Sequence, residues 1–541
     1  MAKQIDLVRE LLDRHCLITP ESYEILEDLD ADIVDIDRLA EALKDEIVVT
    51  PEKLREALAS YEDLLSEGNL EEEVENNELV ESKPTTKVPS KKPEKDSSKE
   101  EIKHTPSAKV QKTEFEPIGK QIKTEINILY ESSGKTTIEG NIKDFQTYFK
   151  SRYNQLFSIL KGRGDISGSI TLKDLMKAKL EPNEKITIIC IVTDKRTLKN
   201  GGLLLELEDA TGKLTARIPA KMQELLVKAG ALLNDQIAGF SGRFYEDMFI
   251  LDDFVFPDIP IVTRKSTIKE PISVCMTSDL HIGSKEFLED SFNGLLDFLN
   301  GRIDDPYQQS LASQIKYLII NGDLVEGIGV YPKQEEDLLI TDIYDQYKRA
   351  DQILSKVPDW IHIIITSGNH DACRLALPQP AISKEYAPDL WKRSNVTFLS
   401  NPTTVDLHKK TFLIYHGNSF EDIASLTPGL SMNDPNGPML HTLRYRHLAP
   451  TFGRNTSIVP SIKDELVIEK VPNVYHTGHI HINSHTQYRG VDCVNSGTFQ
   501  SQTEYMQSKN IIPTPGRVPI LNLHTNKLHE LVFFNQSEIR K

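Results

Sequence analysis

Four of the chain's 15 histidines lie close together near the C-terminus. The stretch "VYHTGHIHINSH" occupies residues 474–485 and begins as an apolar, strand-like run that Gly478 ends. His479 and His481 are two residues apart, so an extended chain would point both imidazoles to one face. Two imidazoles at the end of a strand are typical of metal ligands. A hydrogen-bonded polar strand edge would look the same, so this stretch alone leaves both interpretations open.

Polar residues with the same potential follow four further apolar runs. These runs are "ISVCMTSDLHIG", "IKYLIINGDLVEG", "WIHIIITSGNHDA" and "KTFLIYHGNSF", and each ends in polar residues and glycine. Buried strands with functional groups at their ends are typical of layered α/β enzymes. One such residue alone would more often be a cap or a core hydrogen-bonding group, but the whole set in this order indicates a shared site. The set is Asp279, His281, Asp323, Asn369, His370, Asp371, His416, His479 and His481.

The side chains of this set form a coherent group of metal ligands. Carboxylate, amide and imidazole groups together suit divalent metals such as Mn²⁺, Fe²⁺ or Zn²⁺. No cysteine belongs to the set, which disfavours a structural zinc site. A carboxylate shared by two ions would hold them about 3.5–4 Å apart, the arrangement used for in-line displacement at phosphorus. The residues therefore favour metal-dependent chemistry on a phosphoester.

The motifs "DLH", "GD", "GNHD", "YHG" and "GHIH" resemble those of the calcineurin-like phosphoesterase superfamily. The resemblance implies a layered α/β fold and two divalent metal ions, with Mn²⁺ expected first and Fe²⁺, Zn²⁺ and Mg²⁺ as alternatives. It implies that one ion is held by Asp279, His281, Asp323 and His481. It implies that the other ion is held by Asp323, which bridges, Asn369, His416 and His479. By the same resemblance His370 is the catalytic histidine and Asp371 orients its ring, whereas His476 and His485 match no ligand position.

Longer segments narrow the resemblance. "GNHDACRLALPQPAI", "LRYRHLAPTFGR" and "NIIPTPGRVPILNL" resemble the small subunits of archaeal family D DNA polymerases. The likeness covers nearly all of residues 185–541 and is weak before them. It implies a proofreading 3′–5′ exonuclease in a heterodimer with a large catalytic polymerase subunit. Its further partners would be DNA with a 3′ end and, through the holoenzyme, a sliding clamp. Two alternatives stay open: a free-standing metallophosphoesterase acting on other phosphoesters, and a non-catalytic scaffold subunit, which the intact His370 disfavours.

The chain is long enough, at 541 residues, for roughly three domains. Residues 1–65 predict a small helical domain, because apolar residues recur at helical spacing and "TPE" twice marks a helix start. This domain could dock a partner or be a plain bundle. Residues 66–115 are rich in Lys, Glu, Ser and Pro and predict a disordered linker. The linker could be a solvated tether or could touch DNA through its lysines.

The rest of the chain has the composition of globular domains. Residues 116–184 predict a mixed connecting region. Residues 185–262 contain short strands broken by turn signals, with one helix at "KMQELLVKAGALL", and predict a five-stranded OB barrel. Its many acidic and few aromatic residues favour a structural or subunit-contact role over binding of single strands. Residues 263–541 predict the α/β metallophosphoesterase domain that carries the exonuclease site.

The net charge of −18 is unfavourable for a protein that binds nucleic acid alone, so metal ions or a partner would have to supply positive charge. One local basic stretch is nevertheless predicted to face DNA, and it consists of Arg444, Arg446, Arg454 and Lys463. No apolar run is long enough to span a membrane, the first residues lack a signal-peptide pattern, and the five cysteines form no CxxC motif. These features predict a cytoplasmic protein without a membrane partner.

Overall fold

The computed structural model divides the chain into two units, Met1–Lys109 and Val110–Lys541. It describes the short parallel strands β1 (Leu17–Ile18) and β2 (Val48–Val49), and residues 115–534 except 137, 180, 182, 247 and 262–267. The predicted helical domain and linker therefore lie outside the described residues, apart from those two strands and Phe115. Both stay predictions.

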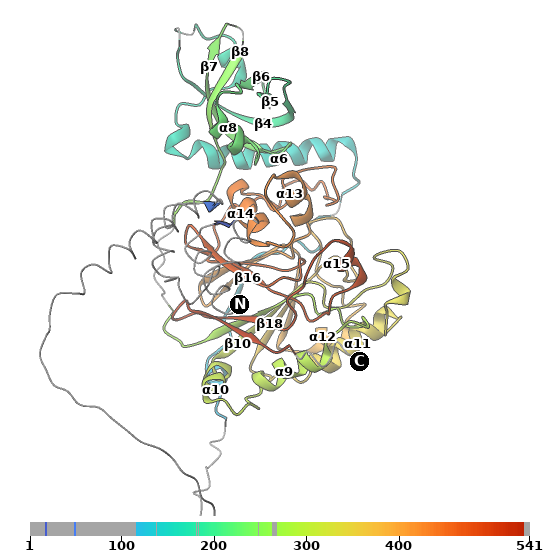
Figure 1. The fold of residues 1–541 in the computed structure, drawn as a ribbon. Coiled ribbons are helices and arrows are strands. Elements are labelled where there is room, and N and C mark those ends of the chain that lie inside the picture. The colour runs from blue at the N-terminus through green and yellow to red at the C-terminus, as the bar shows by residue number, and fades with distance from the viewer. Residues whose placement is uncertain are drawn as a thin grey trace, which may run out of the picture. The chain divides into compact units, whose positions relative to one another are not determined.

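Two six-stranded sheets pack face to face in the larger unit (Figure 1). The first sheet, in spatial order, comprises β12 (Val396–Leu399), β11 (His362–Thr366), β10 (Ile315–Asn321), β9 (Ser273–Thr277), β18 (Arg517–Asn522) and β19 (Leu528–Val532). The second comprises β16 (Ser484–Tyr488), β17 (Val491–Asn495), β15 (Val474–Thr477), β14 (Lys410–Ile414), β13 (Thr403–Leu407) and β3 (Ile126–Tyr130). The layered α/β architecture expected from the sequence is confirmed.

Continuous apolar runs form the central strands because these strands are buried on both faces. Every residue of β10 is buried, and β10 pairs in parallel with both β9 and β11. One core cluster joins the two sheets, with Met276 and Ile319 from the first and Phe412 and Ile414 from the second. The carboxyl ends of β9, β10, β11, β14 and β15 consequently meet at one edge of this sandwich.

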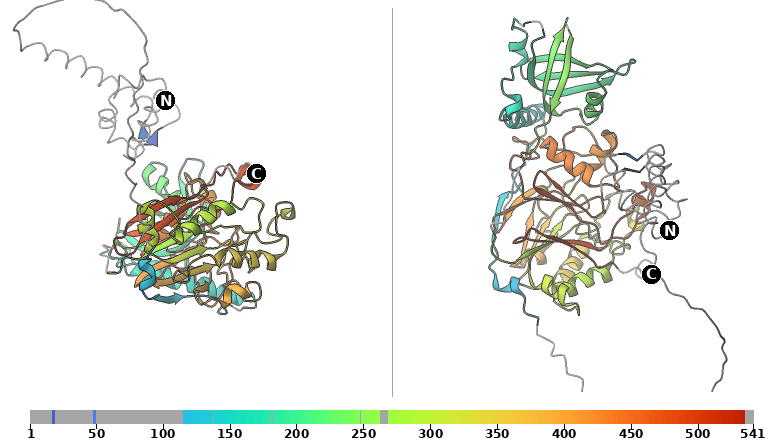
Figure 2. Two further views of the ribbon diagram at one scale, coloured as in Figure 1. Left: turned by 90° about the horizontal axis from the view of Figure 1, so that it is seen from below. Right: turned by 60° about the vertical axis from the view of Figure 1, so that its left-hand side comes forward.

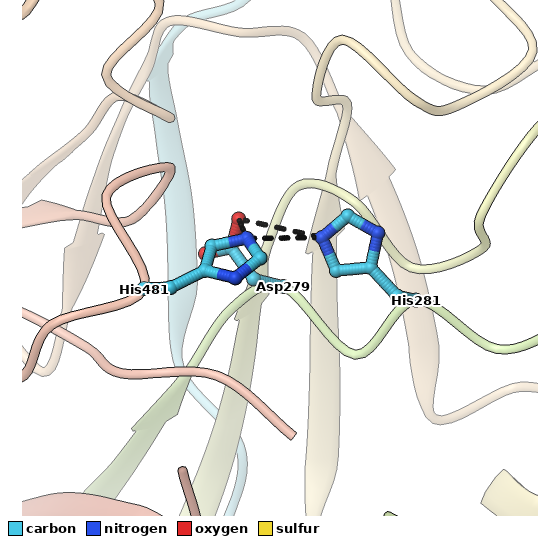
Figure 3. A group of neighbouring side chains, drawn as sticks. All are labelled: Asp279, His281 and His481. Atoms are coloured by element: carbon cyan, nitrogen blue, oxygen red, sulfur yellow. Dashed lines mark hydrogen bonds and ion pairs between the residues drawn. The ribbon is translucent and has the colours of Figure 1, made fainter. Parts of the chain in front are cut away.

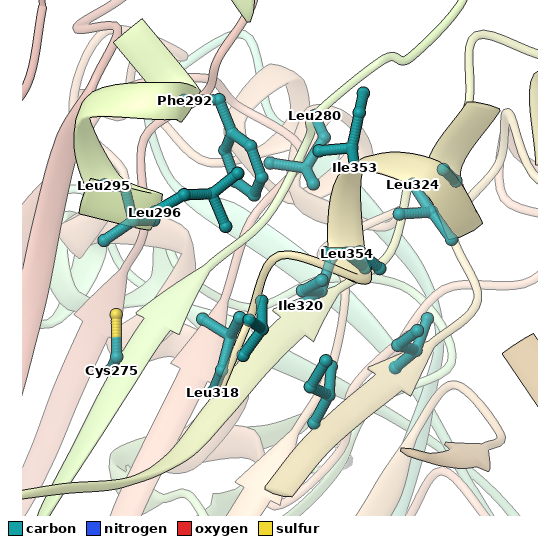
Figure 4. Close-up of a cluster of buried hydrophobic side chains, with 14 of the residues drawn as sticks. Cys275, Leu280, Phe292, Leu295, Leu296, Leu318, Ile320, Leu324, Ile353 and Leu354 are labelled. Atoms are coloured by element: carbon teal, nitrogen blue, oxygen red, sulfur yellow. The ribbon is translucent and has the colours of Figure 1, made fainter. Parts of the chain in front are cut away.

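Helices cover the outer faces of both sheets. The first sheet carries α9 (Glu289–Leu299), α10 (Pro306–Ser313), α11 (Ile343–Leu354) and α12 (Pro388–Lys392). Figure 4 shows Leu296 of α9 and Leu354 of α11 above Leu318 and Ile320 of β10. The second sheet is covered by α13 (Phe420–Leu426) and α14 (Asn436–Tyr445). Two short elements lie in loops near the strand ends, namely η2 (Gln334–Glu336) and α15 (Glu504–Ser508).

The predicted connecting region contributes to both the sandwich and the barrel. Its strand β3 pairs antiparallel with β13 and forms the edge of the second sheet, and α5 (Ile118–Gln121) lies against β10. The remaining helices of this region are α6 (Ile142–Lys161), η1 (Gly164–Ile166) and α7 (Leu172–Leu175). Residues 116–184 therefore belong to the sandwich and to the packing around the barrel, in addition to connecting other parts of the chain.

A closed barrel has the strand order β4–β5–β6–β8–β7. Its strands are β4 (Ile186–Thr197), β5 (Leu203–Asp209), β6 (Gly212–Ile218), β7 (Ile237–Tyr245) and β8 (Met248–Val255), with α8 (Gln223–Ala229) between β6 and β7. Buried and partly exposed residues alternate along β5, so every second side chain of this strand points into the apolar core of the barrel. The five strands and the helix were predicted, and assignment of the barrel to the OB class stays a prediction.

The long helix α6 lies between barrel and sandwich (Figure 2). Its Leu156 and Leu160 pack with barrel residues, while Arg152 is fully buried against the sandwich. The Arg152 guanidinium donates to Asp464 Oδ2 at 2.6 Å and to the Pro450 carbonyl at 3.0 Å. His447 Nε2 also lies 2.8 Å from Asp464 Oδ2. Burial alone would raise the pKa of Asp464, but His447 and Arg152 outweigh it and hold that pKa far below its usual range.

No helix among the described residues is long and apolar enough to cross a membrane.

Replacing Asp464 with alanine should destabilise the larger unit severely, because it leaves the Arg152 cation buried without its counter-charge. Breaking a buried pair in this way typically costs about 3–5 kcal/mol of unfolding free energy. Urea unfolding at pH 7 followed by circular dichroism measures the loss. The difference from wild type should narrow as the pH falls below about 4, since a carboxylate with a lowered pKa stabilises only while it is ionised.

Lys463→Ala is the matched control. It removes the neighbouring exposed pair with Glu469, which is expected to contribute less than about 1 kcal/mol. Equal effects of Asp464→Ala and Lys463→Ala would contradict a structural role for the buried pair.

Candidate active site

The predicted ligands converge because each follows the carboxyl end of a different strand. Asp279, Asp323, Asn369, His416 and His479 lie two or three residues after β9, β10, β11, β14 and β15, respectively. Both sheets thus deliver side chains to one edge of the sandwich. The site side chains approach one another there in three overlapping groups. Asp279 lies with His281 and His481, Asp323 lies with His416 and His479, and His370 lies with His281 and Asp323.

Asp279, His281 and His481 form the first group (Figure 3). His481 Nε2 lies 3.3 Å from Asp279 Oδ1 and 3.1 Å from His281 Nε2. The three ligand atoms lie within 4.8 Å of one another, and all three residues are buried. These are three of the four residues that the family resemblance assigned to one metal, and the fourth, Asp323, lies in the second group.

Asp323, His416 and His479 form the second group. His416 Nδ1 lies 2.9 Å from the Asn321 carbonyl and donates its proton there, so Nε2 faces Asp323 Oδ2 at 3.2 Å. In the neutral ring, this places a nitrogen lone pair against a carboxylate. A proton or a metal cation between them makes the contact favourable.

A bound cation fits the unsatisfied atoms of this site. Asn369 Oδ1 and His416 Nε2 are buried without a hydrogen-bond partner among the described residues. Buried polar atoms are nearly always satisfied in folded proteins, and oxygen and imidazole nitrogen are ligands of divalent metals. The donor set is therefore suited to divalent metal binding.

Electrostatics at the site point the same way. Burial alone would lower the pKa of His416, but Asp323 and Asp279 outweigh it and raise that pKa to about 10. Burial would likewise lower the pKa of His281, whereas Glu326 and the two aspartates raise it to about 9. Burial and the nearby His416 lower the pKa of His479 to about 3, which keeps this ring neutral. The buried carboxylates are thus stabilised by positive charge nearby. The ring of His479 is neutral, and a neutral imidazole is the form that binds a metal.

The backbone at the site departs from the extended conformation expected at the histidine pair. The strand β15 ends at Thr477, and both His479 and His481 adopt left-handed conformations, with φ of 71° and 63°. The expectation that an extended chain would align the two rings is therefore wrong. Left-handed residues that are not glycine are uncommon and cluster at functional sites. Five candidate ligands share this conformation: Asp279, His281, Asp323, His479 and His481.

Two glycines allow the close approach of the loops to the carboxylates. A Cβ at Gly478 would lie 2.6 Å from Asp279 Oδ2, and a Cβ at Gly368 would collide with the Asp323 carboxylate. The backbone N–H of His479 donates to Asp279 Oδ2 at 2.9 Å, and that of His370 donates to Asp323 Oδ1 at 2.8 Å. These donors fix both carboxylates in place.

The prediction that Asp371 orients the ring of His370 is wrong. Asp371 is buried and accepts from Gly368 N and the Tyr347 hydroxyl, so it does not contact the ring of His370. Instead, His370 Nδ1 lies 2.8 Å from the carbonyl of Glu326. Burial, followed by the charge of Asp323, raises the pKa of Asp371 to about 7. Asp371 therefore supports the loop, while Glu326 orients His370.

A cavity of about 680 Å³ opens above the site. His370 contributes to its lining, and its side chain is 15% exposed, so part of this ring is open to the cavity. The remaining site residues of the lining are His281, Asp323, Asn369, His479 and His481. A volume of this size is typical of small-molecule and cofactor pockets.

Comparison with known proteins identifies the family. A family model for the B subunits of DNA polymerases alpha and epsilon matches residues 274–486. The DNA polymerase II small subunit of Methanothermobacter thermautotrophicus is 40% identical over 406 residues, which cover 75% of this chain and 83% of that protein. The chain belongs to the family of archaeal DNA polymerase II small subunits. The resemblance noted from the sequence is thereby confirmed.

Two further matches cover different shares of the chain. The DNA polymerase II small subunit of Pyrococcus furiosus is 40% identical over 73% of this chain, but the match spans only 64% of that longer protein. Among solved structures, an archaeal phosphodiesterase matches 48% of this chain and 99% of its own, with 14% identity and a TM-score of 0.23.

The basic stretch predicted to face DNA is dispersed in this small subunit. Arg446 is buried, and its guanidinium donates to the carbonyls of Ile468 and Glu469, so its prediction as a DNA contact is wrong. Arg444 lies over the ring of Phe256 at 5.2 Å. Lys463 pairs with Glu469, and Arg454 borders a hollow beside the barrel. None of the four lines the cavity above the site.

Two residues that the sequence analysis did not select, Glu326 and Gln500, form hydrogen bonds that hold the ring of His281 in place. Glu326 Oε2 lies 2.8 Å from His281 Nδ1 and accepts from Gln500 at 3.0 Å. The only sequence signal was an acidic residue three positions after Asp323, ahead of Gly327. His476 and His485, to which no role was assigned, lie apart from the two ligand groups, and His476 bonds the Ser496 hydroxyl at 2.9 Å.

Glu326→Gln should weaken metal binding by about 10- to 100-fold, because it removes the charge that orients His281 and raises its basicity. Competition against a fluorescent chelator measures the affinity. Glu336→Gln, an exposed change on the cavity rim, is the control and should leave the affinity unchanged. An unaltered affinity in the Glu326 variant would remove Glu326 from the metal centre.

Proposed function

We propose that this small subunit is a two-metal 3′–5′ exodeoxyribonuclease that proofreads for a large catalytic polymerase subunit. The convergence of the complete set of Asp, Asn and His side chains at an open cavity carries the proposal. One metal would be held by Asp279, His281, Asp323 and His481. The other would be held by Asp323, Asn369, His416 and His479.

Such metals, when bound, supply charge stabilisation at the phosphate and activate water; Mn²⁺ is the first candidate. The chain itself supplies the proton transfer. His370 Nδ1 donates to the Glu326 carbonyl, so a protonated ring, part of which is open to the cavity, holds its second proton at Nε2. From there the proton can pass to the leaving 3′ oxygen of the penultimate nucleotide. His370 would then be the catalytic acid and Glu326 its positioning residue.

The charge of the chain supports a partnership. With a net charge of −18, the small subunit offers little general attraction for DNA, so the large subunit would provide most of the duplex contact. We propose a heterodimer that acts in the cytoplasm on DNA with a 3′ end and that contacts a sliding clamp only through the holoenzyme.

The purified chain with Mn²⁺ should shorten 5′-labelled single-stranded DNA from its 3′ end. Denaturing electrophoresis shows the direction, since 3′ removal gives a ladder of labelled products. EDTA should abolish the reaction. Digestion from the 5′ end, or hydrolysis only of small phosphoesters, would favour a free-standing phosphoesterase instead. Absence of any hydrolysis by the metal-loaded heterodimer would favour a scaffold.

His370→Ala should separate catalysis from metal binding. Its side chain belongs to neither of the two proposed ligand sets, so the metal content should persist, while loss of acid catalysis should slow cleavage by about 10²- to 10⁴-fold. Asp323→Ala should lose metal and all nuclease activity, because it removes the shared carboxylate. Elemental analysis beside single-turnover cleavage distinguishes the two, and polymerase activity of the heterodimer is the control. Equal loss of metal in both variants would refute the division of roles.

A further inference from the structure

The lining of the cavity includes apolar and aromatic side chains beside the candidate metal ligands. Tyr505, Met506 and Ile511, from the segment around α15, are among them, as is Met432. Met506 and Ile511 are buried, whereas Tyr505 is 58% exposed. Figure 1 shows α15 in the loop that connects β17 to β18. The site itself needs no such side chains to hold metal.

The segment that carries Tyr505 is firmly anchored. The Thr503 hydroxyl caps α15 by accepting from Met506 N at 3.3 Å, and Ile511 N donates to the Met506 carbonyl. Asn433 donates to the carbonyl of Asn510 at 3.0 Å. Lys509 lies 3.5 Å from Glu421 of α13 and 5.8 Å from the Tyr505 ring. An exposed aromatic ring on a fixed element offers contact area at little entropic cost.

The charges at the rim disfavour a site that tracks a long polyanion. The rim carries the acidic residues Glu336, Asp337, Glu421 and Glu504, against the cations Lys333 and Lys509. Tyr331, which also lines the cavity, is less exposed than Tyr505, and its hydroxyl donates to Asp337 and Glu326. Affinity for a nucleotide beyond the metal-bound phosphate must therefore come from its base. An exposed tyrosine provides it, because every base has a face that stacks on an aromatic ring.

We infer that Tyr505 is the stacking platform for the base of the 3′-terminal nucleotide, and that α15 determines the preference for unpaired ends. A paired base is stacked within the duplex and cannot reach the ring without being released. This inference rests on the proposed exonuclease function. Tyr505 is a specificity-determining residue here and takes no part in the chemistry.

The test compares single-stranded DNA ending in thymidine with the same strand ending in an abasic residue. Wild-type protein with Mn²⁺ should cleave the thymidine end with a lower KM, by about 5- to 150-fold, and with similar kcat. Tyr505→Ala should abolish this difference by raising KM for the thymidine end alone, while Tyr505→Phe retains it. Tyr245→Ala, which removes a tyrosine exposed on the barrel, is the matched control and should match wild type.

A second readout does not depend on turnover. In a His370→Ala background with Mn²⁺, fluorescence anisotropy should show tighter binding of the thymidine-ended strand, and Tyr505→Ala should remove that advantage. If Tyr505→Ala keeps the full thymidine preference in both assays, or weakens only assembly with the large subunit, the inference is wrong while the exonuclease proposal stands. If wild type cleaves neither strand, the proposed function itself fails.

Discussion

Two buried carboxylates, those of Asp279 and Asp323, impose the constraint on which the rest of this structure depends. Burying a carboxylate without a compensating positive charge costs several kcal/mol of folding free energy. Both of these carboxylates are nevertheless buried, in neighbouring groups of side chains at the edge of the sandwich. Backbone N–H groups and imidazoles surround them, and despite burial the two carboxylates raise the pKa of His416. The same constraint explains why strained, left-handed backbone is retained at the site.

The two-sheet sandwich satisfies this constraint because it brings five strand ends to one place. Neither sheet alone carries all three members of the second ligand group, since Asp323 follows β10 of the first sheet, whereas His416 and His479 follow β14 and β15 of the second. Asn321 ties the sheets together directly behind the site, where its amide donates to the carbonyls of Tyr415 and His476. The geometry of the candidate site therefore depends on the packing of the core, and a shift between the sheets would separate the candidate ligands.

The sequence predicted which residues converge, because each one follows an apolar run, and such a run indicates both a buried strand and the place where it ends. It failed where the answer depends on side-chain direction within a loop. Asp371 adjoins His370 in the sequence, but its carboxylate accepts from Tyr347. The backbone carbonyl of Glu326 instead makes the contact with the His370 ring that was expected of Asp371. Arg446 looked like a surface charge, although its guanidinium caps carbonyls inside the fold. Long-range pairing was equally hidden, since no local pattern tells that β3 belongs beside β13.

The position of β3 has a consequence for how the protein can be divided. Ser132, just beyond this strand, donates to Ser400, which lies 268 residues later, and the entire barrel is encoded between them. During synthesis, the edge of the second sheet must wait for β13 to emerge before it can close, and such distant pairings form slowly. A fragment that begins at the barrel or at β9 would leave β13 with an open edge, which invites aggregation, and would bury Asp464 without Arg152. A fragment that keeps both contacts must therefore begin before α6 and β3, well ahead of the residues of the candidate site.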